Sequence, residues 1–179
     1  ESSGTQHEVL VLGNPENATV EMTIIADVDG QQNESGLLSA TTGTIPEWPA
    51  PDLTPTTSNA DLGGYFLVVY QDDLCWMAIL NSDGRAVWAT QATTDNGRVA
   101  IEAHPSQNGG WLFNRFSEDH AIDEGEIIRV LPTGEIAEEI RTVGAHHSFR
   151  ELEDGTLAYL AVDIREDSEW GSVVGDRLI

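Results

Sequence analysis

Short apolar runs separated by polar turns fill most of the 179-residue chain. Between residues 60 and 179 each run is roughly five to eight residues long, and none continues with the 3.6-residue period of an amphipathic helix. The runs are rich in Val, Ile and Thr and are bounded by Gly, Asn, Asp and Pro, which is typical of strands. The pattern therefore predicts an all-β protein whose strands are joined by tight turns.

The first 40 residues are predicted to form a small β domain, either a small antiparallel sheet or a partial β-sandwich. The segments HEVLVLG (7–13) and TVEMTIIADV (19–28) alternate apolar and other residues, as half-buried strands do. The sequence NPEN (14–17) between them has the composition of a turn. The sequence DVDG (27–30) has a faint likeness to a calcium-binding loop, but it lacks the remaining oxygen ligands, so a turn is the favoured interpretation.

Residues 41–60 are predicted to be an extended linker between this domain and the rest of the chain. The segment contains four prolines, at positions 46, 49, 51 and 55. Proline at that density excludes a helix or a central strand. We expect Trp48, within the linker, to dock on a neighbouring surface.

Residues 61–179 contain an internal repeat. GGYF at 63–66 matches GGWL at 109–112, which in turn matches DGTL at 154–157. The turn DG at 83–84 matches TG at 133–134 in the same order. Two further segments also match, GEII at 125–128 and GDRL at 175–178. A four-stranded antiparallel unit that recurs every ~45–50 residues is the signature of a propeller blade.

The repeat predicts the first blades of an incomplete β-propeller, about two and a half of them. Propellers close with roughly four to eight blades, so the ring would need further polypeptide. We expect it on a second chain or on a missing segment of the same precursor, and self-association is an alternative. An ordinary β-sandwich with accidental internal similarity is the competing fold.

The charge balance limits the partners. The chain has 8 basic and 31 acidic residues, a net charge of −23, and no lysine. A nucleic-acid partner is not expected, because phosphate binding needs clustered Lys and Arg. Acidity of this kind is typical of a secreted, periplasmic or extracellular protein, either from a saline environment or kept soluble by its net charge. Bound divalent cations are a third explanation for the acidity, and calcium is the cation that we keep as an alternative.

Two further features bear on compartment and redox chemistry. Cys75 is the only cysteine, so no intrachain disulfide forms, and its apolar neighbours predict a buried small hydrophobe. No apolar run approaches the roughly 20 residues that a membrane-spanning helix needs. The polar start ESSGTQ without Met is compatible with removal of a signal peptide.

Histidines at the start of the repeats are the first candidates for chemistry. The repeat aligns His104 in one blade with His146 and His147 in the next. Innermost propeller strands converge on a central channel, so these imidazoles could meet around one pocket as nucleophiles, bases or ligands. Neighbouring strand residues face opposite sides, so only one of His146 and His147 can face the channel. Turn or surface histidines are the ordinary alternative.

Three polar residues near these histidines are candidates for substrate binding. Arg115 and Arg150 carry the planar guanidinium that suits sulfate, phosphate or carboxylate, and Asn114 precedes Arg115. A structural salt bridge is the competing interpretation for each arginine in so acidic a chain. No cysteine pair, HExxH, GxSxG or phosphate-binding glycine loop is present.

The segment GAHHSFRELEDGTLAYL (144–160) resembles the strand-turn-strand motif of the bacterial arylsulfotransferase-like propellers. VVGDRLI (173–179) and NSDGRAVWAT (81–90) resemble the strands that follow it in that family, and the family's small β preface fits residues 1–60. The resemblance implies a six-bladed propeller that moves a sulfuryl group between aromatic sulfate esters and phenols through a transient sulfohistidine, with no soluble nucleotide cofactor.

Carried over to this chain, the motif places His146 or His147 among the channel histidines. Ser148 stands where the family usually has Asp, and the family's nucleophilic histidine lies in a later blade. The resemblance therefore implies only part of a site here, inactive by itself, with a small aromatic substrate. Two alternatives stay open: a secreted binding or scaffold propeller without catalysis, and a metal-dependent lactonase or esterase propeller.

Overall fold

The computed structural model describes residues 8–50, 64–93, 97–117 and 125–179, and their regular structure is entirely β. The all-β class predicted from the apolar runs is confirmed. Within these residues there is no helix with the length and apolar character that a membrane span requires.

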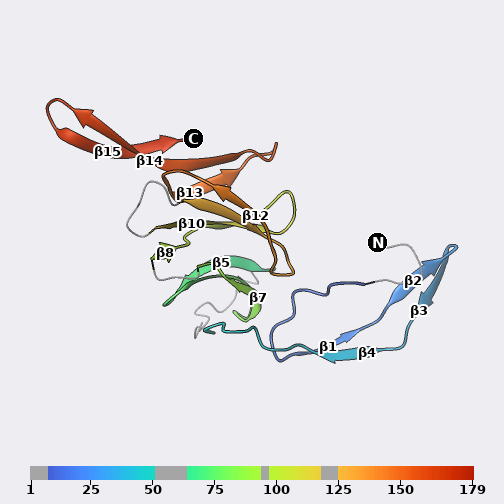
Figure 1. Cartoon of the computed structure of the whole chain (residues 1–179). Helices are drawn as coiled ribbons and strands as arrows, with labels where there is room; N and C mark the ends of the chain where they lie inside the picture. The colour runs from blue at the N-terminus through green and yellow to red at the C-terminus, as the bar shows by residue number, and fades with distance from the viewer. Residues whose placement is uncertain (1–7, 51–63, 94–96, 118–124) are drawn as a thin grey trace.

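The N-terminal part is a two-stranded ribbon and lacks the second layer that a sandwich needs. Its outer section pairs β2 (Ile25–Val28) with β3 (Gln31–Glu34), and its base pairs β1 (Thr19–Met22) with β4 (Leu38–Thr41). The ribbon extends away from the remaining sheets (Figure 1). The predicted small antiparallel sheet is therefore present, whereas the covering layer of a partial sandwich is not seen in the described residues, because alternation of apolar residues does not supply it.

Residues 8–13, predicted as a strand, are not in a strand, and Val9 there is 75% exposed. The turn predicted at 27–30 is confirmed, since it connects β2 to β3. Asp27 Oδ1 accepts a hydrogen bond from the Gly30 N–H at 2.8 Å. That carboxylate is used to close the hairpin turn.

The predicted linker continues from β4, and residues 42–50 contain no strand. Trp48 docks edge-on against Tyr70 and Trp76, with ring centroids 5.8 and 5.6 Å apart. This contact, predicted from the sequence, covers part of the outward side of the next sheet. Residues 51–60 of the predicted linker lie outside the described residues.

Three antiparallel sheets follow the linker. The first sheet has the order β5 (Phe66–Gln71), β6 (Cys75–Leu80), β7 (Ala86–Gln91). The second sheet contains β8 (Arg98–Val99), β9 (Ala103–Pro105), β10 (Trp111–Ser117), β11 (Glu126–Val130) and β12 (Ile136–Arg141). The third sheet has the order β13 (Ala145–Glu151), β14 (Leu157–Asp167), β15 (Gly171–Leu178).

The three sheets stack face to face, and the second is buried on both faces. Phe113 and Ile128 pack toward the first sheet, in a cluster with Cys75 and Met77. Their sequence neighbours Leu112 and Ile127 pack toward the third sheet, against Phe149, Leu157 and Tyr159. Side chains alternate across a strand, so both faces need apolar residues and the strands read as continuous apolar runs.

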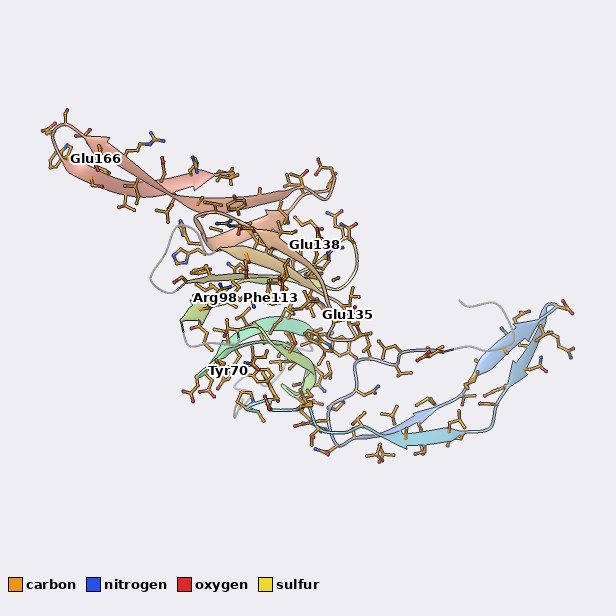
Figure 2. All side chains as sticks on the ribbon, viewed as in Figure 1. Tyr70, Arg98, Phe113, Glu135, Glu138 and Glu166 are labelled. Atoms are coloured by element: carbon orange, nitrogen blue, oxygen red, sulfur yellow. The ribbon has the colours of Figure 1, made fainter. Side chains whose placement is uncertain are left out.

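The stack is visible as three layers in Figure 1. Figure 2 places Phe113 inside it, Glu135 and Glu138 at the β12 side, and Glu166 at the far tip of the β14–β15 hairpin. Cys75 is 4% exposed and belongs to the core between the first two sheets, as predicted. A thiol in that position acts as a small apolar side chain.

The turns set the correspondence between sheets. In the first sheet the Asn81 N–H donates to Arg85 O at 2.9 Å, and in the second the Leu131 N–H donates to Glu135 O at 2.8 Å. The predicted match of the turns at 83–84 and 133–134 is thus confirmed. It makes Met77 the counterpart of Ile127.

The strand pairing matches residues of the second sheet to residues of the third with a shift of one residue relative to the sequence alignment. The Ser106 N–H donates to Gly110 O at 3.0 Å, and the Leu152 N–H donates to Thr156 O at 2.8 Å. Ser106 is thus the counterpart of Leu152, and Trp111 the counterpart of Leu157. A recurring antiparallel sheet is therefore present, while closure into a propeller ring stays a prediction.

Candidate functional site

The candidate residues lie near two edge strands, β9 in the second sheet and β13 in the third. Among the described strands β9 pairs only with β10, and β13 pairs only with β14. Both edges are interrupted. Residues 100–102 separate β8 from β9, and the β13 pairing shifts between Ala145 and Phe149. Bulges of this kind re-aim side chains and often lie next to functional sites.

The sequence alignment of His104 with His146 and His147 is wrong. Strand pairing matches Pro105, opposite Trp111, with Glu151, opposite Leu157. The counterpart of His104 is therefore Arg150. His146 and His147 instead correspond to residues 100 and 101, in the interrupted part of the second sheet. The offset is not visible in the sequence, because the motifs AHP and AHH are similar although they occupy different register positions on their strands.

His104 and Arg150 nevertheless meet, because their strands lie next to each other. The Arg150 Nη1 lies 3.1 Å from His104 Nδ1. A guanidinium only donates, so Nδ1 accepts and the ring proton belongs on Nε2. The Nε2 lies 2.8 Å from Glu102 Oε1, at ion-pair distance, but the angle is not that of a hydrogen bond. The ring also packs edge-on against Phe149, with centroids 5.1 Å apart.

Glu102 joins the two sheets in the same place. Its second oxygen, Oε2, accepts a hydrogen bond from the Phe149 N–H at 3.0 Å. The carboxylate therefore holds β13 through the backbone and faces His104 with its other oxygen. Because Arg150 immediately follows Phe149, this hydrogen bond fixes the position of Arg150 along β13 relative to His104.

Asn114 is 4% exposed and joins the two interrupted edges. Its Oδ1 accepts hydrogen bonds from the N–H groups of Ile101 and Glu102, at 3.1 and 2.9 Å. Its Nδ2 donates to the carbonyl oxygen of His147 in the third sheet. Asn114, predicted as a substrate-binding residue, is in a position to shape both bulges and cannot also offer those groups to a ligand.

His147 is the exposed histidine of the adjacent pair. Its backbone has a φ of 54°, in the left-handed region that a non-glycine residue rarely adopts. The ring lies 4.9 Å from the His146 ring and 6.2 Å from Phe116, centroid to centroid. The Asn114 bond to its carbonyl fits this conformation, which presents the imidazole at the surface.

His146 points the other way and is 8% exposed. Its Nε2 lies 3.0 Å from Asp176 Oδ1 on β15, an ion-pair distance when the ring is protonated, again without an aligned N–H direction. His146 is buried and His147 is exposed, while which of the two faces a central channel stays a prediction. His146 packs against the His147 ring, and its predicted catalytic role stays a prediction.

Arg115 forms its contacts within the second sheet and not with the histidines described above. Its Nε and Nη2 donate to Glu126 Oε2 at 2.9 and 2.6 Å, and Arg98 reaches the same oxygen at 2.9 Å. These contacts favour the salt-bridge interpretation of Arg115, and substrate binding by Arg115 stays a prediction. One carboxylate held between two guanidinium groups satisfies the charge of Arg115 within the second sheet.

Three carboxylates that sequence reasoning missed are central here: Glu102, Glu151 and Asp176. Glu151 Oε2 accepts the Gln107 N–H at 2.7 Å and so joins the β9–β10 turn to β13. A signal existed for Glu102, which precedes His104 by two residues and therefore shares its strand face. Nothing local indicated Glu151 or Asp176, because their partners are about 30 to 45 residues away.

The turn that connects β13 to β14 contains a carboxylate with a lowered pKa. Hydrogen bonds from the backbone N–H and the side chain of Thr156 hold the pKa of Asp154 below its ordinary value of 3.8. A depressed folded-state pKa means that the contribution to stability is full above the unfolded value and is lost as pH falls through the folded value. We expect the Asp154 carboxyl carbon to titrate below 3.8 in an NMR pH series, and Thr156→Val, which keeps the backbone N–H, to reverse only part of the shift. Titration at or above the ordinary value would contradict this assignment.

Among the described residues no group of three or more His, Cys, Asp or Glu side chains is arranged to hold a metal ion. Chemically, the cluster of Glu102, His104, Asn114, His147 and Arg150, called the edge cluster below, offers an exposed imidazole and a guanidinium on one strand. No family model, curated protein or solved structure matches the chain.

Proposed function

We propose that the three sheets are part of a β-propeller that transfers a sulfuryl group between an aromatic sulfate ester and a phenol. The observation that carries the chemical part is the exposed His147, held in a left-handed bulge three residues before Arg150 on β13. An imidazole that can exchange a proton and a guanidinium that can bind sulfate oxygens are the two groups that such a transfer needs.

Arg150 has the role of binding the sulfate. Its side chain is exposed, and the contact described above is to the acceptor nitrogen of His104, which leaves its positive charge uncompensated by that partner. Arg98, Arg115, Arg129 and Arg165 all contact carboxylates instead. A planar guanidinium can donate two parallel hydrogen bonds to sulfate oxygens. Arg150 therefore anchors the sulfuryl oxygens, and His104 orients Arg150.

His147 has the role of general acid and base. A nucleophilic nitrogen from a further sheet attacks sulfur, the bond between sulfur and the aryl oxygen breaks, and His147 gives its proton to the departing phenol oxygen. In the return step an acceptor phenol loses its proton to His147 while its oxygen attacks sulfur and the nitrogen–sulfur bond breaks. Protons and electron pairs balance over the two steps, and no other reactant is required.

The test is an assay of the assembled ring with 4-nitrophenyl sulfate as donor and phenol as acceptor. We expect release of 4-nitrophenol to depend on the phenol concentration, and phenyl sulfate to accumulate in equal amount. Arg150→Gln should raise KM for the donor more than it lowers kcat, because it removes binding charge and leaves the proton donor in place. Absence of turnover in the complete ring would refute the proposal.

A second candidate is a secreted or periplasmic propeller that binds a ligand without turning it over. It is favoured by the engagement of Arg115, His104 and His146 with carboxylates, which leaves few of the predicted groups to act on a substrate. It predicts saturable binding of phenyl sulfate in calorimetry, weakened by Arg150→Gln, with no product.

A further inference from the structure

We propose that the outward face of the third sheet binds a fourth antiparallel sheet of the same repeat, carried by a partner polypeptide. The outward face consists of alternate residues of β14 and the residues paired with them on β15: Ala158, Leu160, Val162, Ile164, Val174, Asp176 and Leu178. Their neighbours Leu157 and Tyr159 pack inward on the second sheet. This inference rests on strand register and not on sulfuryl transfer.

The register identifies the outward face as a docking surface. Met77 pairs with Val69, Ile127 pairs with Asn114, and Leu178 pairs with Leu160 at corresponding places in the first, second and third sheets. Met77 and Ile127 are each 0% exposed, whereas Leu178 is 71% exposed. The first two are covered by the next sheet of the stack. The same position in the third sheet carries a large apolar side chain without that cover.

Neighbouring positions on the outward face show the same pattern. Val174, opposite Ile164 on the paired strands, is 68% exposed, and Ile164 is 49% exposed. Two aliphatic pairs, Leu160 with Leu178 and Ile164 with Val174, flank the Val162–Asp176 pair on this side of the ribbon. Large aliphatic side chains exposed together mark an interaction site in a soluble protein. The upper side of β14 and β15 in Figure 1 faces no other element.

The occupant is a further sheet and not the first sheet of a second copy of this chain. A second copy stacked head to tail would have to offer the outward face of its first sheet, but there Trp48 packs against Tyr70 and Trp76, and Trp76 is only 6% exposed. Docking would have to displace this contact. A net charge of −23 on each copy also opposes self-association.

The chemistry of the partner follows from the two interfaces that are present. The near face of the second sheet carries Trp111 and Phe113 toward the first sheet, and the near face of the third carries Leu157 and Tyr159 at the corresponding places. The partner sheet is therefore expected to present aromatic or large aliphatic side chains at these two places. A carboxylate in the place of Glu151 would accept the Glu153 N–H, as Glu151 accepts that of Gln107.

The test uses the chemical accessibility of position 178. Leu178→Cys adds one exposed thiol to a chain whose native Cys75 is buried. The probe for the missing sheet is a second copy of residues 129–179 placed directly after residue 179, because Ile179 corresponds to Ile128 in the repeat. This extension completes the third sheet with a β12 strand and supplies a copy of the third sheet as the fourth.

We expect maleimide to label the thiol introduced by Leu178→Cys rapidly in the 179-residue chain and at least about tenfold more slowly in the extended chain. Ile136→Cys, 51% exposed on β12, is the matched control and should react equally in both chains. Phe149→Asp with Tyr159→Asp in the added copy only should restore rapid labelling at position 178.

Equal labelling of the Leu178→Cys variant with and without the extension overturns the proposal. So does slow labelling in the 179-residue chain together with the mass of a dimer by light scattering, because a second copy would then cover the face.

Discussion

Replacement of His147 by asparagine in the assembled ring is expected to slow sulfuryl transfer to phenol by about 10²- to 10⁴-fold, the range that general acid–base catalysis supplies. Asparagine is the suitable replacement because it tolerates the left-handed backbone, with its φ of 54°, better than alanine does. The carbonyl that Asn114 holds is retained. The loss therefore reports the imidazole and not the bulge.

The measurement is kcat against pH for the native and variant rings. A proton-transfer role predicts that the variant loses a limb of the pH profile together with the rate, which a purely structural residue would not do. Ser148→Ala, at the next exposed position of the same bulge, is the control and should keep both rate and profile. A His147→Asn ring with native kcat would remove His147 from the mechanism.

The second large effect is expected for stability. Asn114→Leu should lower the free energy of unfolding by about 3 kcal/mol, since three hydrogen bonds of roughly 1 kcal/mol each are lost. The bonds are those to Ile101, Glu102 and His147, and they tie the bulge of the second sheet to the bulge of the third. Leucine keeps a side chain of similar length and branching, so we expect packing to contribute less than the lost hydrogen bonds.

The chain contains its own control for this variant. Leu160 occupies the place of Asn114 in the third sheet, where it pairs with Leu178 as Asn114 pairs with Ile127. Leu160→Asn should cost less than about 1 kcal/mol, because the outward face is partly exposed and water can satisfy the amide. Urea unfolding of both variants measures the difference. Equal destabilisation would show that Asn114 contributes through packing and not through its hydrogen bonds.

Local chemistry explains which structural predictions succeeded. Gly84 and Gly134 close equivalent turns with positive φ angles of 76° and 86°, where glycine is favoured, so the turn match could be read from the sequence. Trp48 among prolines has a large apolar ring and no partner nearby in sequence, which predicted docking. In contrast, a sandwich at the N-terminus required a covering layer, and residues 19–41 form only a ribbon.

Apart from Glu102, the residues of the edge cluster were predicted by residue type, but their geometry was not. His104 and Arg150 were both candidates, yet their contact depends on which residue of β9 lies beside which residue of β13. A shift of register by one residue changes every partner on a strand. The bulges at 100–102 and 146–148 introduce such shifts, and no local pattern marks a bulge that distant side chains such as Asn114 and Glu102 maintain.

By itself, the sequence determined the strands, the turns and their recurrence, because side-chain alternation and glycine conformation act over a few neighbouring residues. Only the tertiary structure decided which histidine is exposed, which arginine is neutralised and which apolar face lacks cover. Those outcomes depend on contacts between residues far apart in the chain, such as Arg115 with Glu126 and His146 with Asp176. Charge pairing and burial act through space, so they become visible only when the sheets are stacked.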